Sequence, residues 1–437
     1  MNHDTGTVLA GEHPAAPCGP HGERLLAGWY DTGRPADLTE HLARYGPPPL
    51  FQARSRGTAM PLVRAVEEAG LTGRGGGGFP TGRKLRSVAG AKGPAVLVAN
   101  GMESEPASHK DEVLLSFAPH LVLDGAALAA VAVGAEAVHL CLPRTRAAQV
   151  DQLTAAVAER RRAGLDPVRV QVHALPHHFV SSEETSLVNW LNGGDARPRS
   201  TPPRPFEKGV GKRPTLIGNV ETLAHLALIA RYGPAWFRAS GNSGAPGTTL
   251  VTVSGAVHRP GVYEIPAGSP VTAALSRAGG PRGRLGAVLA GGFFGGWLPV
   301  PLSTTAPDRG AGVLVALPEG TCGLAETAAA LGYLAAQSAR QCGPCRFGLP
   351  SVAEDFTALA RGSVDAQLLN RLHHRLGLLP RRGACSHPDG AARLAASALR
   401  VFADDVHRHV HGPCGAAFAP LVLPVPAARP PEEGEWR

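Results

Sequence analysis

Apolar residues follow two different periods in the first half of this 437-residue chain. Between residues 64 and 237, segments with helical spacing alternate with short apolar runs at 95–99 and 137–142. Such runs, bounded by polar turns, are typical of strands buried between layers of helices. The most apolar region, 120–142, is interrupted by three ionisable residues, so it predicts a helix followed by a strand and not a membrane span. This part of the chain is therefore predicted to be an α/β layer.

The pattern changes twice in the second half of the chain. Residues 248–255 and 261–265 alternate like two strands, and 271–278 has the spacing of a short helix, which predicts a small α+β module. From about residue 324 to residue 410 the pattern is helical, with interruptions by loops. A helical region is therefore expected to follow the mixed module.

Both ends of the chain have a different character. Residues 1–45 and 413–437 are predicted to be flexible, because segments rich in proline and poor in large apolar residues bury little surface. The first residues lack the cationic start and apolar core of a signal peptide. A cytoplasmic protein without direct membrane insertion is therefore expected.

Composition narrows the classes of partner. The formal net charge of +8 comes mostly from arginine, and no basic block interleaved with aromatic residues is present, so nucleic-acid binding is not expected. The odd number of cysteines, seven, argues against a disulfide framework. Clustered cysteines in a reducing compartment favour metal binding instead.

A glycine-rich loop is the strongest chemical signal. Five glycines at 73 and 75–78 surround Arg74 and precede Lys84. Glycine removes the Cβ that would hold a ligand away, so successive amides can converge on phosphate oxygens while a lysine adds charge. The spacing also matches G-x-G-x-x-G, but the loop follows a helical pattern at 61–70, whereas a dinucleotide fold requires a preceding strand. The loop therefore predicts a phosphate cradle, with a flexible linker as the alternative.

Three polar segments carry carboxylates near expected element ends. Glu103 and Glu105 follow the run at 95–99, and the segments 181–185 and 214–223 each precede a helical pattern. Carboxylates at helix starts commonly only cap the helix, so the residues alone leave capping and ligand binding open for each segment.

A second chemical signal is formed by Cys342, Cys345 and Cys385, because thiolates two residues apart can converge on one metal ion or cluster. A fourth ligand is not fixed by the pattern, and the candidates are His387, Cys322 and Cys414. A Cys₃His zinc site with His387 fits simple ligand counting. A thioredoxin-like redox pair fits less well, because no strand-then-helix pattern surrounds the motif.

The alternating histidines His407, His409 and His411, followed by Cys414, form a third group. These residues could bind metal, but an exposed polar tail is the favoured interpretation.

Together these segments resemble the NADH-oxidising, FMN- and iron–sulfur-containing flavoprotein component of respiratory complex I, its F-type subunit. They resemble equally its relatives in NAD-linked hydrogenases and formate dehydrogenases. The likeness spans residues 64–402 and includes the Gly-rich loop at 73–82, Asn-x-x-Glu-x-Glu-Pro at 100–106, Glu-Glu-Thr at 183–185 and Asn-Val-Glu-Thr-Leu at 219–223. Four motifs in the family's order are far more specific than any one of them.

The resemblance implies an FMN cofactor, NAD(H) as substrate and a [4Fe–4S] cluster held by Cys342, Cys345 and Cys385. It implies that Glu105 and Glu103 act in catalysis, with Glu105 beside the nicotinamide. The residues assigned to cofactor binding are Gly73, Arg74, Gly75, Gly76, Phe79, Lys84, Asn100, Glu103, Glu183, Glu184, Gly218 and Asn219.

The fold implied by the resemblance has three bodies. They are an FMN-binding α/β domain at 46–240, a ubiquitin-like β-grasp domain of the SLBB type at 246–320, and a helical iron–sulfur domain at 322–412. A ferredoxin-like protein or another redox subunit is the implied partner.

This chain also departs from the family pattern. Ala339 stands where the family has the first cluster cysteine, so the fourth iron ligand is unknown. Arg204 and Ser87 replace aromatic residues that serve NADH in the family, and Met102 and Ser182 replace an aspartate and a glycine of the flavin site. A divergent member of the family is therefore indicated.

The predicted function is hydride transfer from NAD(P)H to FMN, followed by single-electron transfer to the iron–sulfur cluster and a partner protein. Two alternatives remain open on the sequence alone. One is a flavoprotein with a donor other than NADH, and the other is a non-catalytic paralogue whose cysteines hold zinc.

Overall fold

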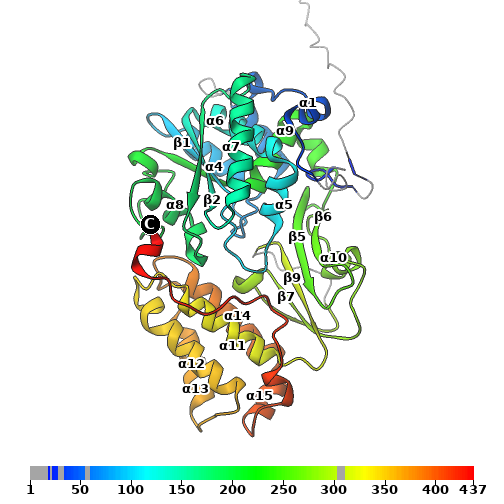
Figure 1. Ribbon diagram of the computed structural model, residues 1–437, viewed down its shortest axis with the longest axis vertical. Helices are drawn as coiled ribbons and strands as arrows, with labels where there is room; N and C mark the ends of the chain where they lie inside the picture. The colour runs from blue at the N-terminus through cyan, green and yellow to red at the C-terminus, as the bar shows by residue number, and fades with distance from the viewer. Residues whose placement is uncertain (1–17, 20–21, 28–33, 55–59, 303–310) are drawn as a thin grey trace, which may run out of the picture.

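The structure of the chain is a computed structural model that describes residues 18–19, 22–27, 34–54, 60–302 and 311–437. These residues form a parallel sheet covered by helices, a second mixed sheet, and a bundle of helices (Figure 1). The predicted order of an α/β layer, a small mixed module and a helical region is therefore confirmed. Both sheets lie on one side of the bundle in the view of Figure 1.

The first sheet is entirely parallel and has the order β3-β2-β1-β4. Its strands are β1 (Ala95–Asn100), β2 (Ala135–Pro143), β3 (Arg169–Leu175) and β4 (Thr215–Asn219). The apolar residues of β1 are buried, as expected for a central strand between two helical layers. Asn100 and Asn219 are paired in register at the carboxyl ends of β1 and β4. Ligand sites of open parallel sheets lie at this end of the strands.

Helices of this α/β part precede, connect and follow these strands. They are α3 (Pro61–Ala69), α4 (Thr81–Ala89), α5 (Lys110–Phe117), α6 (Pro119–Val133), α7 (Ala147–Arg162), α8 (Glu184–Leu191) and α9 (Val220–Arg238). The helix and strand predicted for 120–142 are α6 and β2, so this expectation is confirmed. The segment at 214–223, predicted to open a helix, forms β4 before α9 begins.

The contact between α6 and α9 is unusually close. A Cβ added to Gly125 of α6 would lie 1.9 Å from the carbonyl oxygen of Leu223 in α9. Alanine-rich α6 is buried over almost its whole length. Small residues therefore let the two helix backbones approach.

No single helix among the described residues is long and apolar enough to cross a membrane. The pair α5 and α6 passes the length and composition test only when both helices are counted across a bend of 95°.

The second sheet has the order β6-β5-β9-β7-β8. Its strands are β5 (Thr248–Gly255), β6 (Gly261–Pro266), β7 (Leu285–Ala290), β8 (Gly296–Pro299) and β9 (Val313–Pro318). The short helix α10 (Val271–Arg277) connects β6 to β7. The pairing of β5 with β9 is parallel and the other pairings are antiparallel. This arrangement agrees with the predicted β-grasp module.

The bundle begins directly after the second sheet. Its helices are α11 (Gly323–Ala336), α12 (Leu349–Ala360), α13 (Leu368–Leu378), α14 (His387–Val401) and α15 (Ala403–His409). Their apolar faces share one core with Phe293 and Trp297 of the second sheet. The cysteine-bearing loops lie between α11 and α12 and between α13 and α14.

The two ends of the chain differ from the predicted flexible segments. Within 1–45, residues 1–17, 20–21 and 28–33 lie outside the described residues, but α1 (Leu38–Tyr45) begins at a capping box on Asp37. A short helix, α2 (Leu50–Ala53), follows it.

Residues 413–437, which we call the C-terminal strap, run from α15 back along the bundle to α8 (Figure 1). Trp436 is only 2% exposed, and its ring packs on the side chains of Arg197 and His178. The expectation of a flexible tail is therefore corrected. The buried ring of Trp436 holds this proline-rich segment against the protein, although its composition alone indicates little burial.

Candidate functional site

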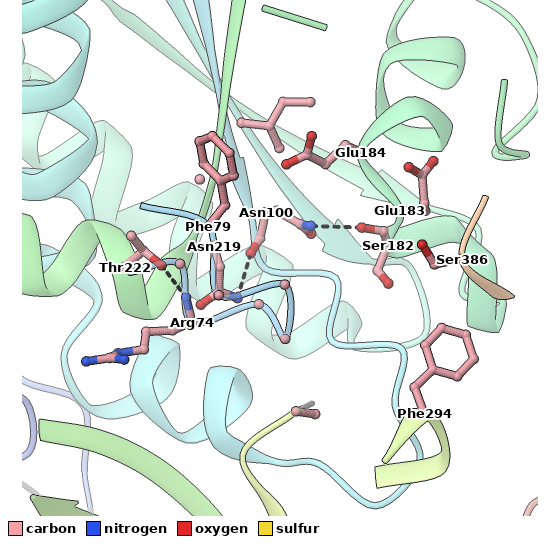
Figure 2. Close-up of a pocket in the computed structure, with 18 of the residues that line it drawn as sticks. Arg74, Phe79, Asn100, Ser182, Glu183, Glu184, Asn219, Thr222, Phe294 and Ser386 are labelled. Carbon is pink, nitrogen blue, oxygen red and sulfur yellow. Dashed lines mark hydrogen bonds between the residues drawn. The ribbon is translucent and has the colours of Figure 1, made fainter. Parts of the chain in front are cut away.

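One large pocket, of about 870 Å³, lies at the carboxyl ends of β1 and β4 (Figure 2). The glycine loop between α3 and α4 forms part of its wall, and the loops that follow β1 and β4 form another. Phe294 of the second sheet and Cys385 of the bundle line the same space. A volume of roughly 300–1,000 Å³ is usual for a cofactor site. All three parts of the fold therefore contribute to one pocket.

The glycine loop has the backbone of an anion cradle. Gly76 and Gly78 have positive φ values of 92° and 61°, which residues with a Cβ rarely adopt. Within the described part of the chain, the amides of Gly75 to Gly78 make no hydrogen bond of good geometry to a protein acceptor. A Cβ on Gly75 would lie 3.4 Å from Cβ of Asn219, so the loop sits directly against the end of β4. Donors left unpaired in a pocket wall suit a phosphate group.

The two cations of this motif have different surroundings. Lys84, in the first turn of α4, lines the pocket and forms an ion pair with Glu184. The guanidinium of Arg74 instead donates to the carbonyl oxygens of Pro246 and Thr248 at 3.3 and 3.1 Å, outside the loop. Figure 2 shows this side chain directed away from Asn100. Arg74 therefore ties the glycine loop to β5.

Asn100 and Asn219 are brought together as the resemblance implies. Asn219 Nδ2 donates to Asp111 Oδ2 at 2.6 Å, and its Oδ1 caps α9 by accepting from the amide of Glu221 at 3.0 Å. Asn100 Nδ2 donates to the carbonyl oxygen of Ser182 at 2.9 Å. Gly218 precedes Asn219 in the same pocket wall. The side-chain amides are thus fixed in orientation by neighbouring segments.

Glu103 is held by an almost complete set of donors. Its carboxylate accepts from Ser108 Oγ at 2.9 Å, from the amides of Asp111 and Glu112 at 2.8 and 2.9 Å, and from Arg146 Nη1 at 3.1 Å. Its φ of 34° is unusual for a residue with a side chain. The carboxylate caps the start of α5 while the residue still lines the pocket.

Glu105 has a different environment from Glu103. Its carboxylate accepts from the amides of Phe293 and Ala107 at 2.9 and 3.3 Å, and no cation pairs with it among the described residues. Burial raises its pKa to about 7, although these amides oppose the shift. A Cβ on Gly292 would lie 2.6 Å from this carboxylate, so the second sheet closes tightly over it. Glu105 is therefore a carboxyl group that can change protonation near neutral pH.

Glu183 and Glu184 stand at the start of α8. Glu183 caps the helix by accepting from the amides of Thr185 and Ser186 at 2.8 and 3.2 Å, and burial raises its pKa. Figure 2 places both carboxylates on the side of the pocket beside Ser182. Both the capping and the ligand interpretation of this segment are compatible with that position.

A buried ionic network at the pocket floor was not identified from the sequence. Lys110 Nζ contacts Asp111 Oδ1 at 2.7 Å and Glu221 Oε2 at 2.8 Å. Burial alone would lower the pKa of Lys110, but Asp111 and Glu221 raise it overall. Glu221 also accepts from the amide of Leu250 in β5 at 3.0 Å. The network therefore connects the floor of the pocket to the second sheet.

Phe294 is a second residue that the sequence did not reveal. Its ring lines the pocket, 4.8 Å from the ring of Phe179 between centroids. The described aromatic side chains of the pocket wall are those of Phe79, Phe179, Phe294 and His387. Since Phe79 is 52% exposed, Phe294 offers a more enclosed stacking surface. Its position after the Gly-rich turn 291–292 gave no sequence signal of its own.

Two departures from the family pattern have structural explanations. Met102 is fully buried in an apolar cluster with Val98 and Leu187, and does not line the pocket. Ser182 does line it, and its hydroxyl lies 2.5 Å from that of Ser104. Met102 therefore packs in the core where the family pattern has a polar residue of the flavin site. Ser182 keeps a polar side chain in the pocket wall.

Cys385 lines the bundle side of the same pocket, and Cys342 and Cys345 lie near it in the bundle. Burial raises the pKa of Cys345, and Cys342 and Cys385 raise it further, which identifies the three thiols as electrostatic neighbours. Among the described residues, no three of these donor atoms, the three sulfurs and a ring nitrogen of His387, all lie within 4.8 Å of one another, as the ligands of a single ion would. The Cys₃His zinc interpretation is therefore disfavoured, while a cluster of several irons spreads its ligands more widely.

The candidates for the fourth ligand have separate positions. Cys322 and Cys414 lie with His409 and not with these three thiols, which removes both from the candidates. His387 Nε2 donates to the carbonyl oxygen of Leu334 at 2.8 Å, and its buried Nδ1 has no partner. Burial lowers the pKa of His387 to about 4, so this ring is neutral. Its free nitrogen suits a metal ligand.

Three family models match the parts of the chain described above. Residues 66–228 match the "Nuo51 FMN-binding domain", residues 250–292 an "SLBB domain", and residues 321–409 the "NADH-ubiquinone oxidoreductase-F iron-sulfur binding region". Each match coincides with one of the three parts of the fold.

Similar proteins cover most of the chain. It is 31% identical to the second NADH-quinone oxidoreductase F subunit of Rhizobium meliloti, over 83% of this chain and 91% of that protein. It is 32% identical to the F subunit of Streptomyces coelicolor (82% and 85%) and 30% identical to that of Escherichia coli (88% and 92%).

Among solved structures, the chain is similar to an NAD⁺-reducing [NiFe]-hydrogenase in the H₂-reduced state, with a TM-score of 0.75 and 31% identity. The match covers 80% of this chain but 62% of the hydrogenase chain, so this chain spans less than two thirds of that one.

Proposed function

Since this chain belongs to the family of NADH-quinone oxidoreductase F subunits, we propose that it transfers a hydride from NADH to FMN, then single electrons to an iron–sulfur cluster and a partner protein. It is an NADH dehydrogenase-like flavoprotein oxidoreductase. The single observation that carries the proposal is the shared pocket, whose lining includes both the glycine loop and Cys385. A flavin held there would lie against the cysteine site.

The glycine loop and Lys84 would hold the FMN phosphate. Bare amides at 75–78 offer donors, and Lys84 offers a positive charge. Because Glu184 pairs with Lys84 in the structure, the phosphate would compete with that carboxylate for the ammonium group. Asn100, Gly218 and Asn219 would orient the ring from the ends of β1 and β4.

When bound, FMN supplies hydride acceptance and one-electron release, and the iron–sulfur cluster supplies one-electron transfer. The protein contributes orientation and charge. Glu103 fixes the start of α5 and presents a carboxylate to the pocket. Glu105 can hold a proton near neutral pH, and its carboxylate accepts from the amide of Phe293, next to the pocket residue Phe294.

Phe294 is proposed to provide stacking surface for the nicotinamide or adenine ring of NADH. It would replace part of the aromatic surface lost at Arg204 and Ser87. Glu183 and Phe79 would contribute to the lining of the same pocket. One enclosed aromatic contact contributes about 0.5–1.5 kcal/mol.

Cys342, Cys345 and Cys385 would ligate three irons of a [4Fe–4S] cluster. The fourth iron requires a ligand other than cysteine, because Ala339 has no donor atom. His387, with its free Nδ1, and Ser338, whose hydroxyl donates to the carbonyl oxygen of Cys345 at 3.4 Å, are candidate donors. A neutral ligand in place of a thiolate would raise the reduction potential of the cluster.

Other redox subunits are the expected partners, as in the complex I and hydrogenase relatives. We propose that a ferredoxin-like protein receives the electrons and that this chain does not itself insert into a membrane. We propose a cytoplasmic setting, as the odd number of cysteines in the sequence suggests.

A steady-state assay of the FMN-loaded full chain with NADH and an artificial electron acceptor tests the proposal. Phe294→Ala is expected to raise KM for NADH by about 2–10-fold, the equivalent of one aromatic contact, with little change in FMN content. Phe51→Ala is the matched control, because Phe51 is 76% exposed and lies outside the pocket. A loaded protein that does not oxidise NADH would contradict the proposed function.

A further inference from the structure

A second group of metal-ligating side chains lies at the junction of the bundle and the C-terminal strap. The Sγ atoms of Cys322 and Cys414 and a ring nitrogen of His409 all lie within 4.8 Å of one another. Cys322 and His409 are 2% and 0% exposed, and Cys414 is half-buried. We propose that these three residues form a zinc site, separate from the iron–sulfur site.

Three separate elements bring the ligands together. Cys322 caps the start of α11, His409 is the last residue of α15, and Cys414 follows in the loop that begins the strap. The sequence favoured an exposed polar tail for His407, His409, His411 and Cys414. That interpretation is correct for His407, but the structure buries His409 against Cys322.

The spacing of the donor atoms fits a tetrahedral ion. Cys322 Sγ lies 3.7 Å from His409 Nε2. Zinc bonds of about 2.3 Å to sulfur and about 2.0 Å to nitrogen, at a tetrahedral angle, separate the two donors by about 3.5 Å. The separation of this pair therefore fits a tetrahedral ion, which would replace the hydrogen bond that the amide of Cys414 donates to His409 Nε2 at 3.4 Å.

The surroundings of His409 select the correct ring nitrogen. His409 Nδ1 lies 3.2 Å from the carbonyl oxygen of Leu359, so this nitrogen carries the proton. The lone pair is then on Nε2, the nitrogen that faces Cys322. A backbone carbonyl on the far ring nitrogen is the usual outer partner of a zinc-bound histidine.

Two features of the position of Cys322 oppose the burial that raises the pKa of its thiol. The amide of Ala325 donates to its sulfur at 3.4 Å, at the N-terminus of the 14-residue helix α11. Backbone donors and the positive end of a helix both stabilise negative charge on sulfur. Two thiolates and one imidazole match zinc better than the oxygen-preferring ions magnesium and calcium.

The neighbours of each thiol show that the two metal sites are distinct. Burial, with a smaller contribution from the thiol of Cys414, raises the pKa of Cys322 to about 11. The corresponding neighbours of Cys345 are Cys342 and Cys385. Cys414 also lies beyond residue 409, where the match to the iron–sulfur family model ends.

The described residues supply three ligands, so the fourth position belongs to water or to an incoming ligand on the exposed side of Cys414. The ion would pin the first residues of the strap. Further along, the amides of Val422 and Leu423 donate to Glu326 at 2.8 and 2.9 Å, and the carbonyl of Trp436 accepts from Ala196 at 2.8 Å. Zinc would therefore fix the strap that joins the bundle to α8 (Figure 1).

Metal analysis of the full chain, purified anaerobically with its FMN and iron, tests this site. About one zinc per chain is expected in addition to iron. Cys414→Ser is expected to weaken zinc binding by more than the 10–100-fold typical of losing only an outer partner, with iron and FMN content unchanged. Cys322→Ser should do the same. His411→Gln and Cys18→Ser are matched controls, because both side chains are exposed and outside the group.

Cobalt substitution of the wild-type chain gives a second readout, which a folding defect in a variant cannot affect. Cobalt in the wild-type site is expected to show the intense visible and near-ultraviolet bands of tetrahedral thiolate ligation, and Cys414→Ser should weaken the thiolate bands. Three results would overturn the proposal: no zinc in the wild-type chain, zinc that is lost with Cys342→Ser but kept in Cys414→Ser, or a Cys322–Cys414 disulfide in place of the ion.

Discussion

At the scale of single residues, the pocket gives the chemically identical carboxyl groups of Glu103 and Glu105 different surroundings. Glu103 is surrounded by four donors, whereas Glu105 has two backbone amides and, among the described residues, no cation. Burial without a counter-charge is the condition that raises a carboxyl pKa, and the pKa of Glu105 is raised to about 7. The two carboxyl groups of one sequence motif therefore have different environments, and Glu105 is the one whose pKa burial raises.

This difference predicts a pH-dependent stability effect. Because the folded pKa of Glu105 lies above its unfolded value, the group contributes stability that is present at low pH and is lost as pH rises from about 4.5 through about 7. Glu105→Gln in the cofactor-free protein should therefore gain stability over wild type by roughly 2–3 kcal/mol between pH 5 and pH 8. Urea unfolding at both pH values measures it.

Glu136→Gln is the control, since that side chain is 66% exposed. A Glu105→Gln difference that does not change with pH would show that the carboxyl group does not titrate in this range.

Residue types also explain which site residues could be predicted. The glycine loop, Asn100, Asn219 and the three cysteines stand in motifs whose residue types follow from their chemistry. The structure brings the loop, both asparagines and Cys385 to one pocket, with Cys342 and Cys345 next to Cys385. Phe294 and Lys110 belong to no motif, because their roles depend on packing between segments far apart in the chain. His409 was misassigned, because the sequence shows alternation of exposed histidines but not the strap that covers one of them.

At the scale of elements, the distance to which two helix backbones can approach decides which helices pack together. Most expected strands and helices are confirmed within a few residues, including β1, β2, β5 and α10, because their apolar periods are clear. The order of strands in each sheet could not be derived in this way. It depends on which helices can lie close together, as α6 and α9 do at Gly125.

Gly125→Ala should therefore destabilise the protein, although alanine is the better helix former. The added methyl group would lie 1.9 Å from Leu223 O, which is backbone and cannot rotate away. A loss of about 1–3 kcal/mol is expected in the free energy of unfolding, as for other overpacked cores.

Gly332 in α11 provides the matched control, because nothing lies within 4 Å of its added Cβ. Gly332→Ala should stabilise by about 0.5–1 kcal/mol. If both substitutions stabilised the protein equally in chemical denaturation, the close α6–α9 contact would be disproved.

At the scale of the whole molecule, polar links join the three parts. The Lys110–Glu221 pair reaches β5 through the amide of Leu250, and Arg74 reaches the carbonyl oxygens of Pro246 and Thr248. The strap forms a third link, from the bundle to the α/β part. The pocket lies among these links, so its shape depends on all three parts.

Lys110→Met tests the central link. It would leave the carboxylates of Asp111 and Glu221 buried without their cation, so a loss of about 3–5 kcal/mol in unfolding free energy is expected. FMN retention should fall as well, because Asn219 depends on Asp111 for its orientation. Lys92→Met, at an exposed position, should change neither quantity. Unchanged stability of Lys110→Met would show that the network is not paired as described.

The proposed path for electrons runs continuously from NADH through FMN to the cysteine site. An anaerobic NADH titration of the full chain, reconstituted with FMN and iron–sulfur cluster and followed by visible and electron paramagnetic resonance spectroscopy, tests it most directly. NADH is predicted to bleach the flavin bands and to produce the signal of a reduced cluster. Flavin that is bleached only by dithionite, or a colourless protein that retains neither cofactor, would contradict the claim.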